Sequence, residues 1–505
     1  MTDIEDLVGE RLMIGLPGAT VADANIRLFT DTRAAGLILY RRNFTSPSQL
    51  LETLGQLESA LGRRLLVATD HEGGRIVMLG QGVTIFPDNL AVGTAGEESF
   101  AFKQGLFEAR ELRRLGIDLN LGPCLDVLTD RYSPNIGIRS YGKDPRVVAR
   151  YGAARIRGMA TGGVSACPKH FPGKGHSPLD AHLRLPTIDS DWAEMQQSHL
   201  VPFFDVLAAG VECVMTSHPV YPKLDPSGVP ATFSRLIVED YLRGQLGFRG
   251  VIVSDDLEMG AVTEWCPIGE AAVRTAAAGH DLLLVCHTEQ AQRAAAGALA
   301  DAYRDGRLPR HGLELAAARV RALRERRVAR AEGGPPAAER DGAPLAMAIA
   351  TRAVTEVTRG RAEFTRALNG RVCVIFPRFS ELAARITIEP EMCDEAGWVR
   401  RTFAGAGVAA EPVLVGMEPA PAEIEAATTR SAAAGATVLF LYDAHLYASN
   451  RALLDAVQKS ARRLAVVLMR DPYDVALLAP EVIGITAYGW RRCQLEAVVA
   501  RLTFP

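Results

Sequence analysis

Residues 163–168 read Gly-Val-Ser-Ala-Cys-Pro, and residues 169–182 read Lys-His-Phe-Pro-Gly-Lys-Gly-His-Ser-Pro-Leu-Asp-Ala-His. The first run is short and apolar, which is typical of a buried strand. In the second run, glycine and proline disfavour regular structure. The sequence therefore predicts a strand followed by a loop rich in lysine, histidine and aspartate. Loops held by a rigid scaffold are where functional residues concentrate.

Seven further strand-like runs occur in the first 290 or so residues, each followed by a helical pattern. They are Arg11–Leu16, Gly36–Tyr40, Arg64–Thr69, Asp118–Leu121, Cys213–Thr216, Gly250–Ser254 and Asp281–Cys286. Continuous apolar strands that alternate with helices indicate a parallel sheet. Eight such units predict an α/β fold, a (β/α)8 TIM-type barrel. The alternative is an open, doubly wound sheet, although open sheets of eight strands are less common.

Polar residues follow five of these runs. They are Asp70-His71-Glu72, Asp126, Lys169-His170, Ser217-His218 and Asp255-Asp256. A barrel of this type carries its active site at the carboxyl ends of its strands. The regular placement of these polar residues therefore favours the barrel over the open sheet.

The composition changes at residues 331–344, which are rich in alanine, glycine and proline. This is typical of a linker, so we expect a catalytic barrel at 1–330 and a C-terminal domain at 345–505. That domain is predicted to be a smaller α/β sandwich with four strands and an amphipathic helix. The strands are Arg371–Phe376, Thr437–Tyr442, Leu464–Met469 and Val482–Ala487, and the helix is Asn450–Ala461.

The composition also excludes several classes of partner. A formal net charge of −3 does not indicate binding to nucleic acid or to an anionic membrane. We found no apolar run long enough to span a bilayer and no secretory signal in the acidic first residues. The eight cysteines are scattered without a CxxC pair, which favours a reduced cytoplasmic protein over a disulfide framework or a zinc site. No cofactor is expected.

Asp255 ends a strand beside a second carboxylate, Asp256. Because successive side chains of a strand point opposite ways, only one of the two is expected to face the site. Asp255 is a candidate nucleophile, and the alternative is a helix N-cap.

Asp180 and His182 lie two residues apart in the long loop. An aspartate that accepts from one imidazole nitrogen leaves the other nitrogen free for proton transfer. Two alternatives remain open, a loop held by its own polar contacts and a metal site. Standard zinc spacings are absent, so no metal is expected.

Lys169 and His170 lie at the end of the strand before the loop, and Asp70 lies at the end of the third strand. Buried lysines are rare unless paired, so Lys169 is expected to face a carboxylate or a ligand hydroxyl. Arg139 is a candidate ligand-binding residue. Alternatively, it forms a surface salt bridge with Asp144.

Together these segments resemble glycoside hydrolase family 3, and within it the β-N-acetylglucosaminidases. Four blocks carry the resemblance: Asp70–Arg75, Arg139–Pro145, Lys169–His182 and Ser254–Met259. Their order and spacing agree with the family over about residues 5–290. Beyond the linker, Arg470-Asp471-Pro472-Tyr473-Asp474 looks like a segment of two-domain members.

The resemblance implies a retaining hydrolase that removes terminal β-linked N-acetylglucosamine from oligosaccharides or cell-wall fragments. Asp255 would be the nucleophile, with His182 the acid/base and Asp180 its partner. The residues implied to bind the sugar are Asp70, Arg139, Lys169 and His170.

Three departures from the family pattern occur: Ala181 inside the Asp-x-His pair, Met78 and Leu79 in place of a second arginine, and His71 in place of glutamine. The missing arginine weakens the case for a cell-wall fragment as substrate. Three other functions are alternatives. A phosphorylase would use the same residues, a β-glucosidase would lack the Asp-x-His loop, and a non-catalytic sugar-binding protein would have lost one of the three catalytic residues.

Overall fold

The computed structural model describes residues 3–129, 133–176, 185–332, 342–366, 368 and 370–504. The chain divides into two compact units. The first comprises Met1–Glu72, Gln81–Thr84 and Glu98–Gly342, and the second comprises Gly73–Gly80, Ile85–Glu97 and Ala343–Pro505. Residues 333–341 of the predicted linker lie outside the described residues.

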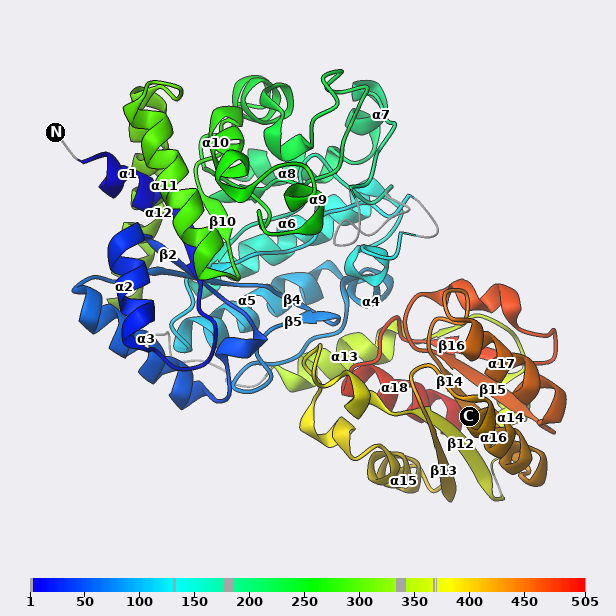
Figure 1. Cartoon of the computed structure of the whole chain (residues 1–505). Helices are drawn as coiled ribbons and strands as arrows, with labels where there is room; N and C mark the ends of the chain where they lie inside the picture. Colours follow the sequence, from blue (N-terminus) through cyan, green and yellow to red (C-terminus); the bar gives the residue numbers. More distant parts are fainter. Residues whose placement is uncertain are drawn as a thin grey trace. The chain divides into compact units, whose positions relative to one another are not determined.

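The first unit, which includes most of the blue-to-green part of Figure 1, contains eight short parallel strands. Their bounds are β1 Leu12–Gly15, β2 Gly36–Leu39, β3 Leu66–Thr69, β6 Leu119–Asn120, β7 Ser165–Ala166, β8 Cys213–Met215, β9 Val251–Val253 and β10 Leu283–Val285. Six strands pair in the order β10-β1-β2-β3-β6-β7, and β8 pairs with β9. Single parallel bridges, Phe171 with Thr216 and Val253 with Leu282, close the strands into a ring. The predicted barrel is therefore confirmed, and each of the eight expected runs contains one of its strands.

The strands read as continuous apolar runs because both of their faces are buried. Met13, Ile38, Leu66, Met215 and Val253 belong to one core cluster and are 2% exposed or less. Helices cover the outer face, as parallel strands require a crossover of this kind. They include α2 Asp23–Thr32, α3 Pro47–Leu61, α5 Glu98–Arg114, α6 Pro145–Gly162, α8 Val201–Ala208, α10 Ile268–Ala278, α11 Glu289–Arg304 and α12 Arg310–Glu332.

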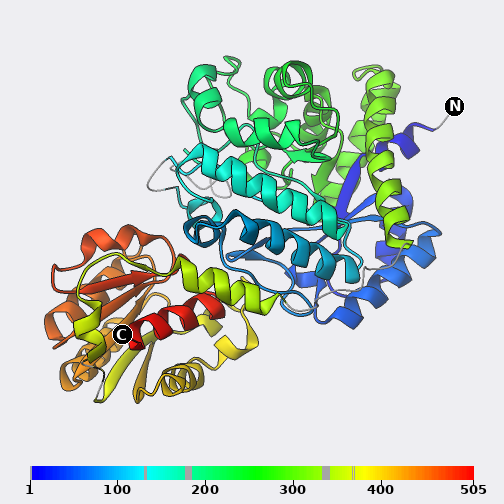
Figure 2. The same ribbon diagram turned by 180° about the vertical axis from the view of Figure 1, so that it is seen from behind.

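Local sequence sets where these helices begin and end. Helix α3 starts at Pro47 after Ser46, whose hydroxyl accepts from the Gln49 amide, and it stops at Gly62 in the left-handed conformation. These are the preferred residues at a helix start and end. The helices α5 and α6 run side by side over much of their length (Figure 2).

The second unit contains a six-stranded sheet in the order β11-β16-β15-β14-β12-β13. The strands are β11 Thr355–Glu356, β12 Val372–Pro377, β13 Ala410–Val415, β14 Ala436–Leu441, β15 Leu464–Leu468 and β16 Ile483–Thr486. Only β11 is antiparallel to its neighbour. The four predicted strands are present, and the edge strands β11 and β13 were not predicted. Strand β13 contains Glu411 and Pro412 and is only partly buried, so it lacks the apolar signal of a central strand.

Helices lie on both faces of this sheet. The helices α16 Pro421–Ala433 and α17 Ala448–Ser460 share a core cluster with Leu439 and Leu441 of β14. Phe440, which points the other way, contacts Trp398 of α15 Glu395–Gly405. The helices α13 Ala343–Ala353 and α18 Arg492–Thr503 pack on each other, and α18 also contacts α15. The predicted α/β sandwich is therefore confirmed.

No helix among the described residues combines the length and the apolar character needed to cross a bilayer.

Candidate active site

Lys169 follows β7 and lies at the carboxyl end of the barrel strands. Its side chain is 4% exposed, and its ammonium group forms ion pairs with Asp70 and, at 2.7 Å, with Glu72 Oε1. Burial disfavours the charge, but Asp70 and Glu72 raise the pKa of Lys169 above its ordinary value. The expected pairing of Lys169 with a carboxylate is thus present, and the group stays an ammonium.

Glu72 connects Lys169 to Arg139. Its two oxygens accept from Arg139 Nε at 2.9 Å and from Arg139 NH2 at 2.8 Å. Burial opposes ionisation, but Arg139 and Lys169 together hold the pKa of Glu72 well below its usual range. The alternative of a surface bridge from Arg139 to Asp144 does not occur, because Asp144 instead accepts from the Arg146 amide at the start of α6. Glu72 was not predicted as a site residue, although it lies in the Asp70-His71-Glu72 cluster at a strand end.

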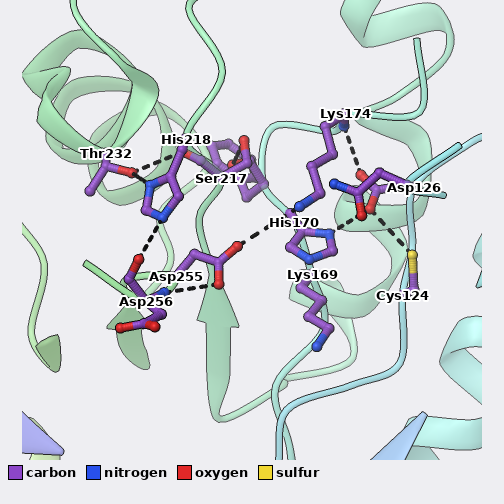
Figure 3. A network of polar contacts seen from close by, with 12 residues as sticks. Cys124, Asp126, Lys169, His170, Lys174, Ser217, His218, Thr232, Asp255 and Asp256 are labelled. Carbon is purple, nitrogen blue, oxygen red and sulfur yellow. Dashed lines mark hydrogen bonds and ion pairs between the residues drawn. The ribbon is translucent and has the colours of Figure 1, made fainter. Parts of the chain in front are cut away.

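His170 is held by Asp126, which follows β6 (Figure 3). His170 Nδ1 lies 2.6 Å from Asp126 Oδ2, and Asp126 Oδ1 accepts from the Lys174 amide at 2.7 Å. The Cys124 thiol donates to Asp126 Oδ2 at 3.2 Å. One buried carboxylate therefore orients the imidazole and the start of the loop after β7.

Cys124, Asp126 and His170 also form a group whose possible ligand atoms lie within 4.8 Å of one another. Both oxygens of Asp126 already accept hydrogen bonds within the group or from Lys174. Burial also raises the pKa of the Cys124 thiol well above its ordinary value, which disfavours the thiolate that would bind a metal. The geometry therefore fits a positioning role for Asp126 and His170.

Asp255 follows β9 and is the carboxylate that faces this network (Figure 3). Its side chain is 17% exposed, its Oδ2 lies 3.8 Å from Lys174 Nζ, and its Oδ1 accepts from the Asp256 amide at 2.9 Å. Burial opposes ionisation, but Lys174, His218 and Lys169 lower the pKa of Asp255 below its ordinary value. The structure thus provides an ionised, partly accessible carboxylate with one oxygen held by the backbone.

The neighbouring carboxylate of Asp256 has different partners. Its Oδ2 lies 3.0 Å from His287 Nε2, and its Oδ1 accepts from the Glu258 amide at 3.1 Å. The expectation that only one of the two aspartates faces the network therefore agrees with the structure.

His218, after β8, lies beside both aspartates. Its Nε2 donates to the Asp256 carbonyl at 3.0 Å, and its Nδ1 lies 2.6 Å from the Thr232 hydroxyl. Burial lowers the pKa of His218. This imidazole supports the strand end that carries the nucleophile candidate. Its position after a strand was a signal in the sequence, but its partners were not foreseeable.

Asp180 and His182 lie in residues 177–184, outside the described residues. Of the other predicted residues, Asp70, Arg139 and Lys169 belong to one ion-paired group that Glu72 holds together. His170 and Asp255 belong to a second group, in which Asp126 and Lys174 connect them. The structure adds Glu72, Asp126, Lys174 and His218. An ionised carboxylate beside buried cations can act as a nucleophile toward an electron-poor carbon.

Comparisons with known proteins identify the family of this chain. The profile of the Glycosyl hydrolase family 3 N terminal domain matches residues 4–323. The Beta-hexosaminidase of Xylella fastidiosa (strain 9a5c) is 36% identical over 284 residues, which is 55% of this chain and 84% of that protein.

Two solved structures are also similar. The glycoside hydrolase family 3 beta-N-acetylglucosaminidase from Paenibacillus sp. str. FPU-7 superposes with a TM-score of 0.92 at 31% identity, covering 100% of this chain and 97% of that one. NagZ from Neisseria gonorrhoeae, in complex with N-trifluoroacetyl-D-glucosamine, gives a TM-score of 0.53 at 31% identity, covering 62% of this chain and 98% of that one. The chain therefore belongs to glycosyl hydrolase family 3 and is a glycoside hydrolase.

Proposed function

We propose that this protein is a retaining exo-β-N-acetylglucosaminidase that uses Asp255 as its nucleophile. The observation that carries the proposal is the state of Asp255, an ionised and partly exposed carboxylate at a strand end, next to the ammonium of Lys174. The similarity to a β-N-acetylglucosaminidase over the full length supports the substrate class.

In the first step, Asp255 attacks the anomeric carbon while the glycosidic bond breaks. The departing oxygen takes a proton from the imidazolium of His182, and a glycosyl-aspartate ester forms. In the second step, water gives a proton to His182 and attacks the same carbon, which releases the sugar and the Asp255 carboxylate. Asp180 would stabilise the imidazolium. The roles of His182 and Asp180 rest on the family resemblance.

Asp70, Arg139, Lys169 and His170 are proposed to bind the sugar. Lys169 and Arg139 share the carboxylate of Glu72, which fixes both side chains before any ligand arrives. A preorganised group loses less entropy on binding than a free one. His170 is similarly fixed by Asp126.

We also propose that the protein works in a reducing compartment such as the cytoplasm. All eight cysteines are free thiols in the structure, including the exposed Cys393. Free thiols are typical of proteins kept reduced by the cell.

The test is release of nitrophenol from 4-nitrophenyl N-acetyl-β-glucosaminide and from the matching glucoside, each with and without phosphate. We expect release from the N-acetyl substrate that does not depend on phosphate and is abolished in Asp255→Asn. Asp301→Asn, an exposed carboxylate on α11, is the matched control and should retain activity. Phosphate-dependent formation of a sugar 1-phosphate would instead establish a phosphorylase, and preference for the glucoside would overturn the substrate assignment.

His182→Ala should slow the natural substrate more than the nitrophenyl substrate, because nitrophenolate leaves without a proton. Equal loss on both substrates would contradict the role of His182 as the leaving-group acid.

A further inference from the structure

A cavity of about 1000 Å³ lies at the amino ends of β15 and β16 in the second unit. Leu464 and Ile483, the first residues of these strands, form part of its wall. All residues that line it belong to the second unit, and none belongs to the candidate active site. The volume is at the upper end of the range for small-molecule sites, roughly 300–1000 Å³.

The cavity is strongly cationic. Among the described residues, its lining includes Arg359, Arg366, Arg462 and Arg463 and one acidic side chain, Glu481. Four positive charges against one negative charge leave a local excess of three positive charges, whereas the whole chain carries a formal net charge of −3. The positive charge is therefore a local feature of this cavity.

Three of these guanidinium groups have no partner in the part of the chain that the structure describes. Among the described residues, the side chains of Arg359, Arg462 and Arg463 form neither an ion pair nor a hydrogen bond. By contrast, Arg371 and Arg430 of the same unit both pair with Glu411. Five N–H donors on each unpaired guanidinium remain available for an anionic ligand.

The walls of the cavity are tied together by hydrogen bonds. The Thr358 hydroxyl donates to the Val482 carbonyl at 2.9 Å and accepts from the Gly484 amide at 2.6 Å. Gln458 of α17 accepts from the Ala479 amide at 2.7 Å. These contacts connect the segment at residue 358 and helix α17 to the segment that contains Pro480 and Val482, which lines the cavity.

Part of the lining is apolar. Pro480 is exposed and Ala461 is half-buried, whereas Phe364 and Val482 are each only 2% exposed. Such a surface can receive a ring or another uncharged portion of a ligand, while the guanidinium groups bind its charged portion. A bare inorganic anion would leave this apolar surface unused.

We propose that this cavity binds a small organic phosphate, such as a nucleotide or a sugar phosphate. Guanidinium groups bind phosphate through paired, charge-assisted hydrogen bonds. A phosphate group near neutral pH carries close to two negative charges, which suits a cluster of unpaired arginines better than a single carboxylate does. This site is separate from hydrolysis at Asp255 and does not depend on the function proposed above.

The experiment is isothermal titration calorimetry on the full chain in a phosphate-free buffer with ADP, glucose 6-phosphate and inorganic pyrophosphate. We expect at least one organic phosphate to bind with a dissociation constant below about 1 mM and more tightly than pyrophosphate. The double variant Arg462→Ala/Arg463→Ala should weaken that binding by about tenfold or more. Comparing the dissociation constants of ADP and glucose 6-phosphate distinguishes a nucleotide from a sugar phosphate as the ligand.

The matched control is Arg371→Ala/Arg430→Ala, which removes the same charge from the same unit outside the cavity. It should bind the organic phosphate as the wild type does. A second cavity variant, Arg359→Glu, should also weaken binding by about tenfold or more. Circular dichroism and the midpoint of thermal unfolding, compared with those of the wild type, report that each variant is folded. The proposal is overturned if the wild type binds none of the probes, if pyrophosphate binds as tightly as both organic phosphates, or if the control pair weakens binding as much as the cavity pair.

Discussion

Glu72 holds two proposed sugar-binding residues at once, since its buried carboxylate accepts from both Arg139 and Lys169. Glu72→Gln keeps the shape but removes the charge, so two buried cations lose their shared counter-ion. We expect the free energy of unfolding to fall by about 3 kcal/mol and kcat/KM to fall by about tenfold or more. Urea denaturation and steady-state kinetics measure the two effects.

Glu98→Gln is the control for this prediction, because Glu98 and its partner Arg157 are both largely exposed. It should change neither quantity appreciably, since exposed pairs contribute little. A stable and fully active Glu72→Gln variant would show that Asp70 alone is a sufficient partner for Lys169.

Lys174 is the ammonium nearest to Asp255, with 3.8 Å between Nζ and Oδ2. Burial disfavours the carboxylate of Asp255, and Lys174 is the largest influence that lowers its pKa. Lys174→Met should therefore raise that pKa and move the acidic limb of the kcat/KM profile to higher pH. Lys103→Met, at an exposed position on α5, should leave the profile where it is. An unshifted limb in Lys174→Met would exclude this electrostatic role.

At the scale of elements, His280 connects the segment before β10 to helix α10 and to the end of β8. Its Nδ1 donates to the Thr275 carbonyl at 3.0 Å, and its Nε2 lies 2.8 Å from the Thr216 hydroxyl. Burial lowers the pKa of His280 to about 3. A histidine of the unfolded chain has a pKa near 6.5. Between these two pKa values the imidazole is therefore protonated in the unfolded chain and neutral in the folded chain. This contribution to stability is present above about pH 6.5 and is lost as the pH falls toward 3.

The predicted measurement is the unfolding free energy of wild type and His280→Gln at pH 7.5 and pH 5. The wild type should lose about 2 kcal/mol more than the variant between these two conditions, from 1.36 kcal/mol per pH unit over about 1.5 units. His311→Gln, at an exposed site, should follow the wild type. Equal losses in wild type and His280→Gln would mean that His280 is protonated in the folded state.

Gly175 shows how closely the loop after β7 lies against the segment that follows β6. A Cβ at this position would be 1.8 Å from the Val127 carbonyl oxygen and 2.6 Å from its carbon. Backbone atoms cannot move aside as a flexible side chain can, so Gly175→Ala must displace the segment that carries Lys174. We expect activity to fall by about 100-fold, as small displacements of reacting groups commonly cause. Gly297→Ala on α11, where a Cβ meets nothing within 4 Å, should retain activity.

At the scale of the whole molecule, two segments from early in the sequence belong to the second unit. Phe86, Ala91 and Val92 are fully buried there, and α4 Asn89–Thr94 packs on α13. Arg491 Nε donates to the Gly74 carbonyl at 2.7 Å. These segments therefore depend on residues more than 250 positions away in the chain.

A fragment of residues 1–342 should consequently expose the apolar side chains of residues 85–97. We expect it to aggregate, as judged by size-exclusion chromatography with light scattering. Co-expression with residues 343–505 should restore a soluble species. A monomeric fragment with full activity would show that these segments find other partners in the first unit.

The sequence by itself determined the eight barrel strands, four strands of the second unit and the strand ends that carry Asp70, Lys169, His170 and Asp255. These follow from local patterns, since a buried parallel strand is continuously apolar and the carboxyl ends of such strands converge. The tertiary structure decided the rest. It pairs Arg139 with Glu72 and not with Asp144, places Lys174 beside Asp255, and assigns residues 73–80 and 85–97 to the second unit. Contacts between residues distant in the chain cannot be predicted from local sequence periodicity. Which charged groups meet depends on how the strands and loops assemble in three dimensions.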